Sequence, residues 1–288
     1  MYVVTGATGR VGSVVAQTLL DAGAEVRVIV RWAEDAAVWA RRGARTHIAT
    51  LTDRRALAAG FRDVAGVFVL LPFDLTVPDL DAHADGLVAS IAGAVVDSAV
   101  PHVVMLSSGG ADLAEGTGPI AGLHRLELAL GRTGAVVTAL RSGHFQEKVG
   151  DVLSAAMAEG IYPVFASSAD VAVPMVATQD LGEVAAHLLL APPARSEAVD
   201  IVGPAYSERD VANVLGTALG RALTVETVPA EAWAGALQVA GFAPHVAQSL
   251  AELYRADEAG LLAPRGDRVV QVSTPLEATI GRMLAVLS

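Results

Sequence analysis

Three glycines near the beginning of the chain have the spacing of a loop that binds phosphate. Gly6, Gly9 and Gly12 follow the apolar run 2–5, and an amphipathic helical pattern covers residues 10–22. Glycine adopts a tight turn at little cost, and the N–H groups at a helix N-terminus attract an anion. A strand, a glycine loop and a helix in this order therefore predict a dinucleotide-binding site. Its expected contacts are Gly6, Thr8, Gly9, Arg10, Val11 and Gly12.

The residue after the second predicted strand bears on the kind of dinucleotide. Sites that prefer NAD usually place an acid there for the ribose 2′-hydroxyl, whereas an arginine suits a 2′-phosphate. Here the strand 25–30 is followed by Arg31, and no acid occurs before Glu34. Arg10, inside the glycine loop, offers a second positive charge, so the pair favours NADP(H). The alternative interpretation is that both are ordinary surface arginines in an arginine-rich chain.

Strand-like and helix-like segments alternate through the first half of the chain. Short apolar runs predict strands at 2–5, 25–30, 44–49, 67–71, 103–106 and 136–140. Patterns between them predict helices at 10–22, 35–42, 53–61, 78–99 and 119–132, with Asp53 as an N-cap. This alternation predicts an α/β fold, a Rossmann-type doubly wound parallel sheet that binds its ligand at the carboxyl ends of the strands.

From about residue 150 the pattern loosens. Helices are expected at 152–159 and 180–190, short strands at 198–202 and 223–228, an irregular segment or short strand at 170–176, and a mostly helical tail over 231–288. We therefore expect a dinucleotide-binding domain over residues 1–150 and a smaller mixed, mostly helical substrate lobe over 151–288. Within the second lobe, residues 177–203 could pack back on the Rossmann sheet. A substrate cleft is expected between the two parts.

Composition argues against several other functions. The 288 residues contain no cysteine, which excludes disulfides and thiol catalysis, and the histidines lack metal-ligand spacing, so we expect no metal site. A net charge of −11 argues against nucleic acid as the main partner. No run of about 18 apolar residues lacks polar breaks, so we expect no membrane span. Strand residues begin at position 2, so we expect no signal peptide and a cytoplasmic protein. The sequence leaves the oligomeric state open.

Several short motifs along the chain have a distinctive order and spacing. They lie at 6–12, 28–31, 107–111, 124–127, 140–147, 180–185 and 202–204. Together they resemble the NmrA-like branch of the short-chain dehydrogenase/reductase superfamily. That branch includes quinone oxidoreductases, triphenylmethane reductase, atypical polyketide ketoreductases and redox-sensing regulators. The resemblance covers most of the chain.

The resemblance implies cofactor contacts beyond the glycine loop. In relatives the stretch after the sixth strand passes the nicotinamide, and the turn after the fifth strand holds a serine that orients the substrate. The further cofactor contacts expected are Arg31, Ser107, Ser108, His124, Ser142 and Gly143. Leu71 and Pro72 are expected to border the cofactor because they end the fourth strand, and the alternative is that Pro72 only stops the strand. Lys148 stands where relatives commonly carry Asn, which would alter the wall of the pocket.

The chain lacks the Tyr-x-x-x-Lys pair that typical members of the superfamily use as a proton donor. No tyrosine lies between Tyr2 and Tyr162, and Lys148 is the only lysine. A reductase must still stabilise negative charge that develops on oxygen.

Three groups could replace the missing pair, and each has a plainer alternative. His124 lies on the helix that would carry the pair, and the alternative is that it binds ribose or lies on the surface. His144 follows the sixth strand, and the alternative is that it only lines the pocket. Ser107 ends the fifth strand, where a turn role is the alternative. A fourth option is that no side chain donates a proton, because a quinone or conjugated ketone spreads the charge.

Two classes of function remain in competition, with a third ranked last. The first is an NADPH-dependent reductase of a hydrophobic, planar ketone or quinone, with an aromatic polyketide ketone in antibiotic biosynthesis as one candidate. The second is a non-catalytic regulator that senses NADP(H) and binds a protein partner. An isomerase or epimerase of nucleotide sugars ranks last, because relatives of that type retain the Tyr/Lys pair.

Overall fold

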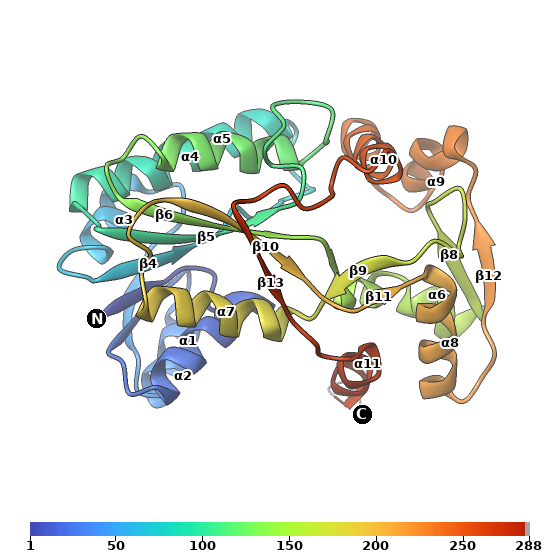
Figure 1. Cartoon of the computed structure of the whole chain (residues 1–288), viewed down its shortest axis with the longest axis horizontal. Helices are drawn as coiled ribbons and strands as arrows, with labels where there is room; N and C mark the ends of the chain where they lie inside the picture. The colour runs from blue at the N-terminus through green and yellow to red at the C-terminus, as the bar shows by residue number, and fades with distance from the viewer. Residues whose placement is uncertain (286–288) are drawn as a thin grey trace.

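The computed structural model describes residues 1–285, and its main element is an eight-stranded parallel sheet of order β13-β10-β6-β5-β4-β1-β2-β3 (Figure 1). The strands are β1 (Tyr2–Val4), β2 (Val26–Val30), β3 (Arg45–Ile48), β4 (Gly66–Val69), β5 (His102–Ser108), β6 (Val136–Ser142), β10 (Glu197–Val202) and β13 (Arg268–Gln271). From β1 the strand order runs outward to β3 on one side, and from β4 it runs outward to β6 on the other. The order therefore reverses between β1 and β4, which is the position at which doubly wound sheets bind ligands. The predicted Rossmann-type fold is confirmed.

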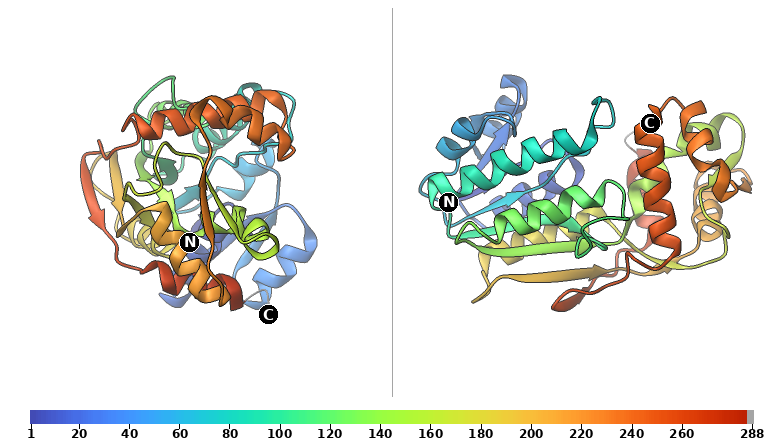
Figure 2. Two further views of the ribbon diagram at one scale, coloured as in Figure 1. Left: turned by 90° about the vertical axis from the view of Figure 1, so that its right-hand side faces the viewer. Right: turned by 90° about the horizontal axis from the view of Figure 1, so that it is seen from above.

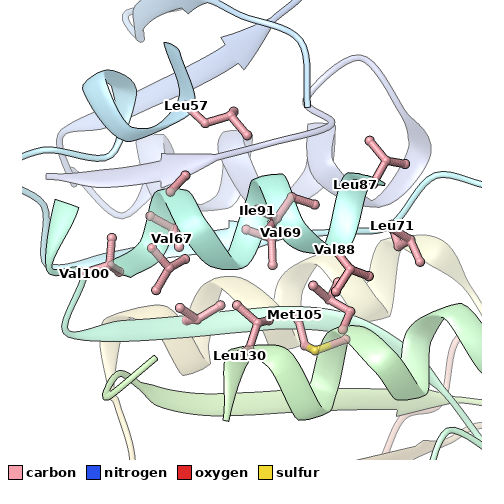
Figure 3. Close-up of a cluster of buried hydrophobic side chains, with 14 of the residues drawn as sticks. Leu57, Val67, Val69, Leu71, Leu87, Val88, Ile91, Val100, Met105 and Leu130 are labelled. Atoms are coloured by element: carbon pink, nitrogen blue, oxygen red, sulfur yellow. The ribbon is translucent and has the colours of Figure 1, made fainter. Parts of the chain in front are cut away.

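Three helices cover one face of this sheet: α3 (Arg54–Gly60), α4 (Leu80–Ser98) and α5 (Ile120–Leu130). Val67 and Val69 of β4 face these helices, because side chains alternate along a strand. Figure 3 shows them beside Ile91 of α4. Burial of each such side chain contributes roughly 1.5–3 kcal/mol.

The opposite face carries α1 (Arg10–Asp21), α2 (Ala33–Arg41) and α7 (Thr178–Leu190). The close contact between α1 and α7 depends on Gly182, since a Cβ there would lie 2.4 Å from Val14 Cβ. The helix that follows the glycine loop is therefore held firmly against the sheet. Segment 177–203 lies on the sheet, with α7 on this face and β10 beside β6.

The predicted helices of the first half are all present, with ends shifted by a few residues. Asp53 caps α3 as expected, accepting a hydrogen bond of 2.9 Å from the Ala56 N–H. The fourth strand is shorter than predicted, because β4 ends at Val69 and Leu71 already lies in the loop that follows.

The remaining elements form a smaller layer beyond the carboxyl ends of the strands (Figure 1). Its small sheets are β11-β9-β7 (Ala205–Tyr206, Val173–Val176, His144–Phe145) and β12-β8 (Thr224–Thr227, Ile161–Val164). Its helices are α6 (Leu153–Ala158), α8 (Glu208–Leu219), α9 (Trp233–Val239), α10 (Pro244–Glu258), α11 (Leu276–Ala285), and the 3-10 helices η1 (Gln146–Asp151) and η2 (Ala230–Ala232).

The tail is mostly helical over its described residues, as expected. The sequence did not predict that residues 268–271 within it form β13 and extend the large sheet beside β10. Val269 and Val270 pair in register with β10, and two adjacent valines are too short a run to identify a strand in the sequence. Positions 286–288 of the predicted tail lie outside the described residues.

Within the smaller layer, helix α10 is the element next to the large sheet, as the right-hand view of Figure 2 shows along its length. Near its start, His245 Nε2 lies 3.0 Å from the Val77 carbonyl oxygen in the β4–α4 loop. A Cβ on Gly118 would lie 2.2 Å from the Ser249 carbonyl oxygen, so the β5–α5 loop also approaches this helix closely. Within residues 1–285, we find no helix with the length and apolar character that a membrane span requires.

Candidate active site

The glycine loop leaves the N-terminus of α1 open. Gly6 has a φ of +64°, and the Gly9 N–H donates to the Gly6 carbonyl oxygen over 2.9 Å, which closes the turn. Gly9 is the N-cap of α1, and no side chain caps the helix. The N–H groups of its first turn therefore remain available to an anion at the switch point of the sheet.

The three glycines are needed for different reasons. A Cβ on Gly12 would lie 2.3 Å from the Gly6 carbonyl oxygen, and one on Gly6 would lie 2.6 Å from Leu70 Cδ2, so both positions are required by the fold. At Gly9 the nearest atom would be 3.4 Å away, an ordinary contact, and its φ of −94° suits any residue. The fold itself does not need Gly9, so its missing side chain fits a ligand that approaches the backbone closely.

Arg10 and Arg31 flank this loop without ion-pair partners. Neither forms a salt bridge with a carboxylate of the described residues. A Cβ on Gly150 would lie 3.6 Å from Arg10 Nη2, so the Arg10 side chain reaches toward η1. Arg31 faces the loop after β4: hydrogen bonds from Thr76 lower the pKa of Asp74, and the charges of His83 and Arg31 lower this pKa further.

Leu71 and Pro72 lie at the carboxyl end of β4, next to the glycine loop. Leu71 is buried, and Pro72 is exposed on a cavity of about 550 Å³. The β4–α4 loop, the β5–α5 loop and α10 enclose this cavity. Glu115, within the β5–α5 segment, lines it, and Glu252 lines it from α10.

Ser107 belongs to a buried ion-pair network that the sequence did not reveal. Its hydroxyl donates to Glu127 Oε1 over 2.6 Å, and Arg141 Nη2 donates to Glu127 Oε2 over 2.6 Å. The side chains of Arg141 and Glu127 are only 10% and 15% exposed. The hydrogen bond with Glu127 raises the pKa of Arg141, so this guanidinium stays charged. The network joins β5, β6 and α5 beside the predicted nicotinamide position.

His124 is anchored to the turn after β5. Its Nδ1 lies 2.8 Å from the Ala111 carbonyl oxygen, so Nδ1 carries the proton and Nε2 is the other ring nitrogen available for a ligand. His124 and Glu127 lie three residues apart, so both project from the side of α5 that faces the end of β5.

Ser108, Ser142 and Gly143 meet where β5 and β6 end. Ser108 and Ser142 are register partners, and the Gly109 N–H donates to the Ser142 carbonyl oxygen over 2.9 Å. This arrangement brings the predicted cofactor contacts of β5 and β6 together at the carboxyl edge of the sheet. The Ser108 hydroxyl makes only a long contact of 3.5 Å with the Ser142 carbonyl oxygen.

His144 contacts the smaller layer instead of the end of β5. Its Nε2 lies 3.0 Å from Asp257 Oδ2 of α10, and the two side chains are 18% and 30% exposed. His144 opens β7, directly after β6, and pairs in register with Met175 of β9. The structure therefore places Ser107 and His124 on the α5 side of the edge and His144 against α10.

Lys148 and Tyr254 approach each other, but their arrangement does not make the tyrosine more acidic. Lys148 Nζ lies 5.7 Å from the centroid of the Tyr254 ring, over its face. Burial raises the pKa of Tyr254, and the charges of Asp151 and Glu208 raise it further, whereas a lysine that activates a tyrosine lowers its pKa. Within residues 1–285, no group of three or more His, Asp or Glu side chains is arranged to hold a metal ion.

The parallel sheet, its glycine loop and the layer beyond its carboxyl edge define an α/β protein of the Rossmann class. The model of the NmrA-like family matches residues 2–280, so the chain belongs to that family. The predicted family is thus confirmed.

Individual relatives agree with this assignment. The chain is 27% identical over 276 residues to NAD(P)H azoreductase of Xenophilus azovorans, which covers 95% of this chain and 93% of the relative. Triphenylmethane reductase of Citrobacter sp. has a TM-score of 0.80 at 22% identity, covering 99% of each chain. The NADPH-dependent quinone oxidoreductase of Escherichia coli, solved with NADPH, has a TM-score of 0.77 at 20% identity and covers 99% of this chain and 100% of its own. At these identities the two structures show the shared fold.

Proposed function

We propose that this chain is an NADPH-dependent reductase that transfers a hydride to a hydrophobic, planar acceptor without a Tyr/Lys pair. The acceptor is a quinone, a dye or a conjugated ketone, and an aromatic polyketide ketone is the most specific candidate. When bound, the dinucleotide supplies the hydride. Everything else must come from the residues around it.

The observation that carries the proposal is the open N-terminus of α1 beside two arginines that form no salt bridge within residues 1–285. In this assignment the N–H groups of the first turn of α1 hold the pyrophosphate, and Gly9 lets the backbone approach it. Arg31, with Arg10, binds the 2′-phosphate and so favours NADP(H) over NAD(H). Ser142 and Gly143 border the nicotinamide, with His124 on the α5 side.

The names of the relatives support the acceptor class. They are described as an azoreductase, a triphenylmethane reductase and a quinone oxidoreductase, and each of these acts on a conjugated acceptor. A quinone or an azo compound spreads the negative charge that follows hydride addition, and a triphenylmethane cation is neutralised by the hydride, so each relaxes the need for a strong proton donor. The absence of the Tyr/Lys pair is compatible with this chemistry.

The test is NADPH oxidation with a panel of acceptors: a naphthoquinone, an azo dye, a triphenylmethane dye and an aromatic polyketide ketone. We expect turnover with at least one acceptor, and slower turnover with NADH than with NADPH. NADPH binding without turnover of any acceptor would contradict the reductase assignment. It would favour the regulator, which a protein partner sensitive to the NADP+/NADPH ratio would then identify.

A further inference from the structure

The contact between His144 and Asp257 joins the end of β6 to helix α10. His144 Nε2 lies 3.0 Å from Asp257 Oδ2. The Nε2 atom is buried, and none of the described residues forms an aligned hydrogen bond with it. The Asp257 carboxylate is therefore the only acid of residues 1–285 placed against this nitrogen.

From this contact we infer that Asp257 positions His144, and that His144 delivers the proton that a quinone takes up on reduction. The inference rests on the proposed function. Asp257 acts through the histidine and need not touch the acceptor. His144 is the group that would meet the acceptor oxygen, because it directly follows the Ser142-Gly143 turn.

The carboxylate determines which ring nitrogen exchanges the proton. The negative charge of Asp257, 3.0 Å from Nε2, favours a proton on that nitrogen in both the neutral and the charged ring. Nδ1 is then the nitrogen that gains and loses a proton. No hydrogen bond to Nδ1 is found among residues 1–285, and Nδ1 is not among the buried unpartnered atoms, so it remains accessible.

The other two candidate donors are less well placed for this role. The Ser107 hydroxyl already donates its only proton to Glu127. His124 directs Nδ1 to the Ala111 carbonyl oxygen, a neutral partner that stabilises a charged ring less than a carboxylate does. His144 is the candidate that combines an accessible ring nitrogen with a carboxylate on the other nitrogen.

The proposed step balances for a quinone. The quinone gains a hydride and becomes a hydroquinone monoanion. The Nδ1–H bond of the charged ring then breaks, and an O–H bond forms on the monoanion. The neutral ring, still protonated at Nε2, regains its Nδ1 proton from water. A triphenylmethane dye is a cation, so hydride addition alone gives the neutral product and no proton is required.

This difference between acceptors gives the test. Asp257→Asn and His144→Asn are compared with wild type, with a quinone and with a triphenylmethane cation as acceptors. General acids contribute about 10²–10⁴-fold, so we expect kcat with the quinone to fall about 100-fold in H144N and about tenfold in D257N. With the dye, kcat should change less than about twofold.

Two further variants distinguish a role of Asp257 in positioning His144 from a role in stabilising the fold. Asp257→Glu keeps a carboxylate and should recover part of the quinone rate. Glu159→Gln removes an exposed acid at the end of α6, where it makes no side-chain contact that the structure describes, and should leave both rates unchanged. Equal losses with quinone and dye, or no loss with either, would overturn the inference.

A measurement without cofactor or substrate tests the positioning directly. Ring ¹⁵N spectra of the histidines should show the His144 proton on Nε2 in the neutral ring, and Asp257→Ala should shift the ring toward a mixture of tautomers. A proton on Nδ1 in wild type would overturn the inference. If wild type reduces neither acceptor, the proposed function fails, and these spectra still decide whether Asp257 positions the ring.

Discussion

The two halves of the carboxyl edge of the sheet are built in opposite ways. On the β1, β2 and β4 side, no side chain caps the N-terminus of α1, and Arg10 and Arg31 form no salt bridge within residues 1–285. On the β5, β6 and β10 side, polar side chains are joined to one another. Ser107 and Arg141 both bind Glu127 there.

This difference separates groups that await a ligand from groups that hold the fold. Unpartnered backbone and charged groups contribute little to the folded protein and can bind an anion. A buried charge that loses its partner is costly, so the joined groups should affect stability first. Substitutions on the two sides should therefore divide into effects on binding and effects on unfolding.

The largest effect should come from the β5, β6 and β10 side of the edge, which we call the joined side because its polar side chains bind one another. Glu127→Ala leaves the Arg141 guanidinium buried without its partner, and we expect the free energy of unfolding to fall by about 3–5 kcal/mol. Urea denaturation measures this change. Glu159→Ala, at an exposed site, should stay within about 0.5 kcal/mol of wild type. A fully stable E127A protein would contradict the view that this network holds the fold.

On the β1, β2 and β4 side of the edge, which we call the open side, Arg31→Ala should weaken NADPH binding and leave the stability of the fold unchanged. A hydrogen bond to a charged group contributes about 1.5–3 kcal/mol, so the Kd for NADPH should rise about 10–100-fold while that for NADH stays nearly constant. Fluorescence titration with both dinucleotides checks this, with Arg41→Ala in exposed α2 as the control. An equal loss for both dinucleotides would mean that Arg31 does not contact the 2′-phosphate.

A smaller effect should separate two glycines of the same loop. Gly9→Ala fits the fold, so the melting temperature should hold while the Kd for NADPH rises about tenfold. Gly12→Ala places a Cβ against the Gly6 carbonyl oxygen, so it should cost about 1–3 kcal/mol of stability. If both variants lose stability equally, Gly9 is a structural residue and its role in the cofactor site is not supported.

The smallest effect should appear as a pH dependence at Asp200 of β10. This side chain is 3% exposed, and burial raises its pKa above the ordinary 3.8, although the Gly266 N–H donates to it. A raised carboxyl pKa stabilises the fold below 3.8 and loses that contribution as pH rises through the folded-state value. Asp200→Asn should therefore gain stability relative to wild type as pH rises toward neutral. Urea denaturation at several pH values measures this change. A difference in the free energy of unfolding between the variant and wild type that is the same at every pH would contradict the prediction.

The open side of the edge could be predicted from sequence, because its parts are local. The glycine loop lies within seven residues, and Arg31 directly follows a strand that an apolar run identifies. Backbone geometry and short spacings determine this half. The same local logic predicted the strands β1 to β6 and the Asp53 cap.

The joined side could not be predicted, because its contacts link distant segments. Glu127 and Arg141 appeared only within the motifs 124–127 and 140–147, because nothing in their spacing shows that α5 and β6 place them together. Asp257 meets His144 only because α10 returns to the end of β6. The strand β13 could not be predicted for the same reason, because its pairing with β10 determines that it is a strand more than its own residues do.

Helix α10 restricts how the cleft can open. It contacts the β4–α4 loop through His245, the β5–α5 loop through Ser249 and the end of β6 through Asp257. A hinge motion that swings the smaller layer, with α10, away from the sheet would break the contacts with both loops together, because they lie along one rigid helix. Displacement of a single loop breaks only one of them. Substrate entry and product release should therefore depend on local loop opening, with α10 acting as a strut that keeps the two layers at a fixed separation.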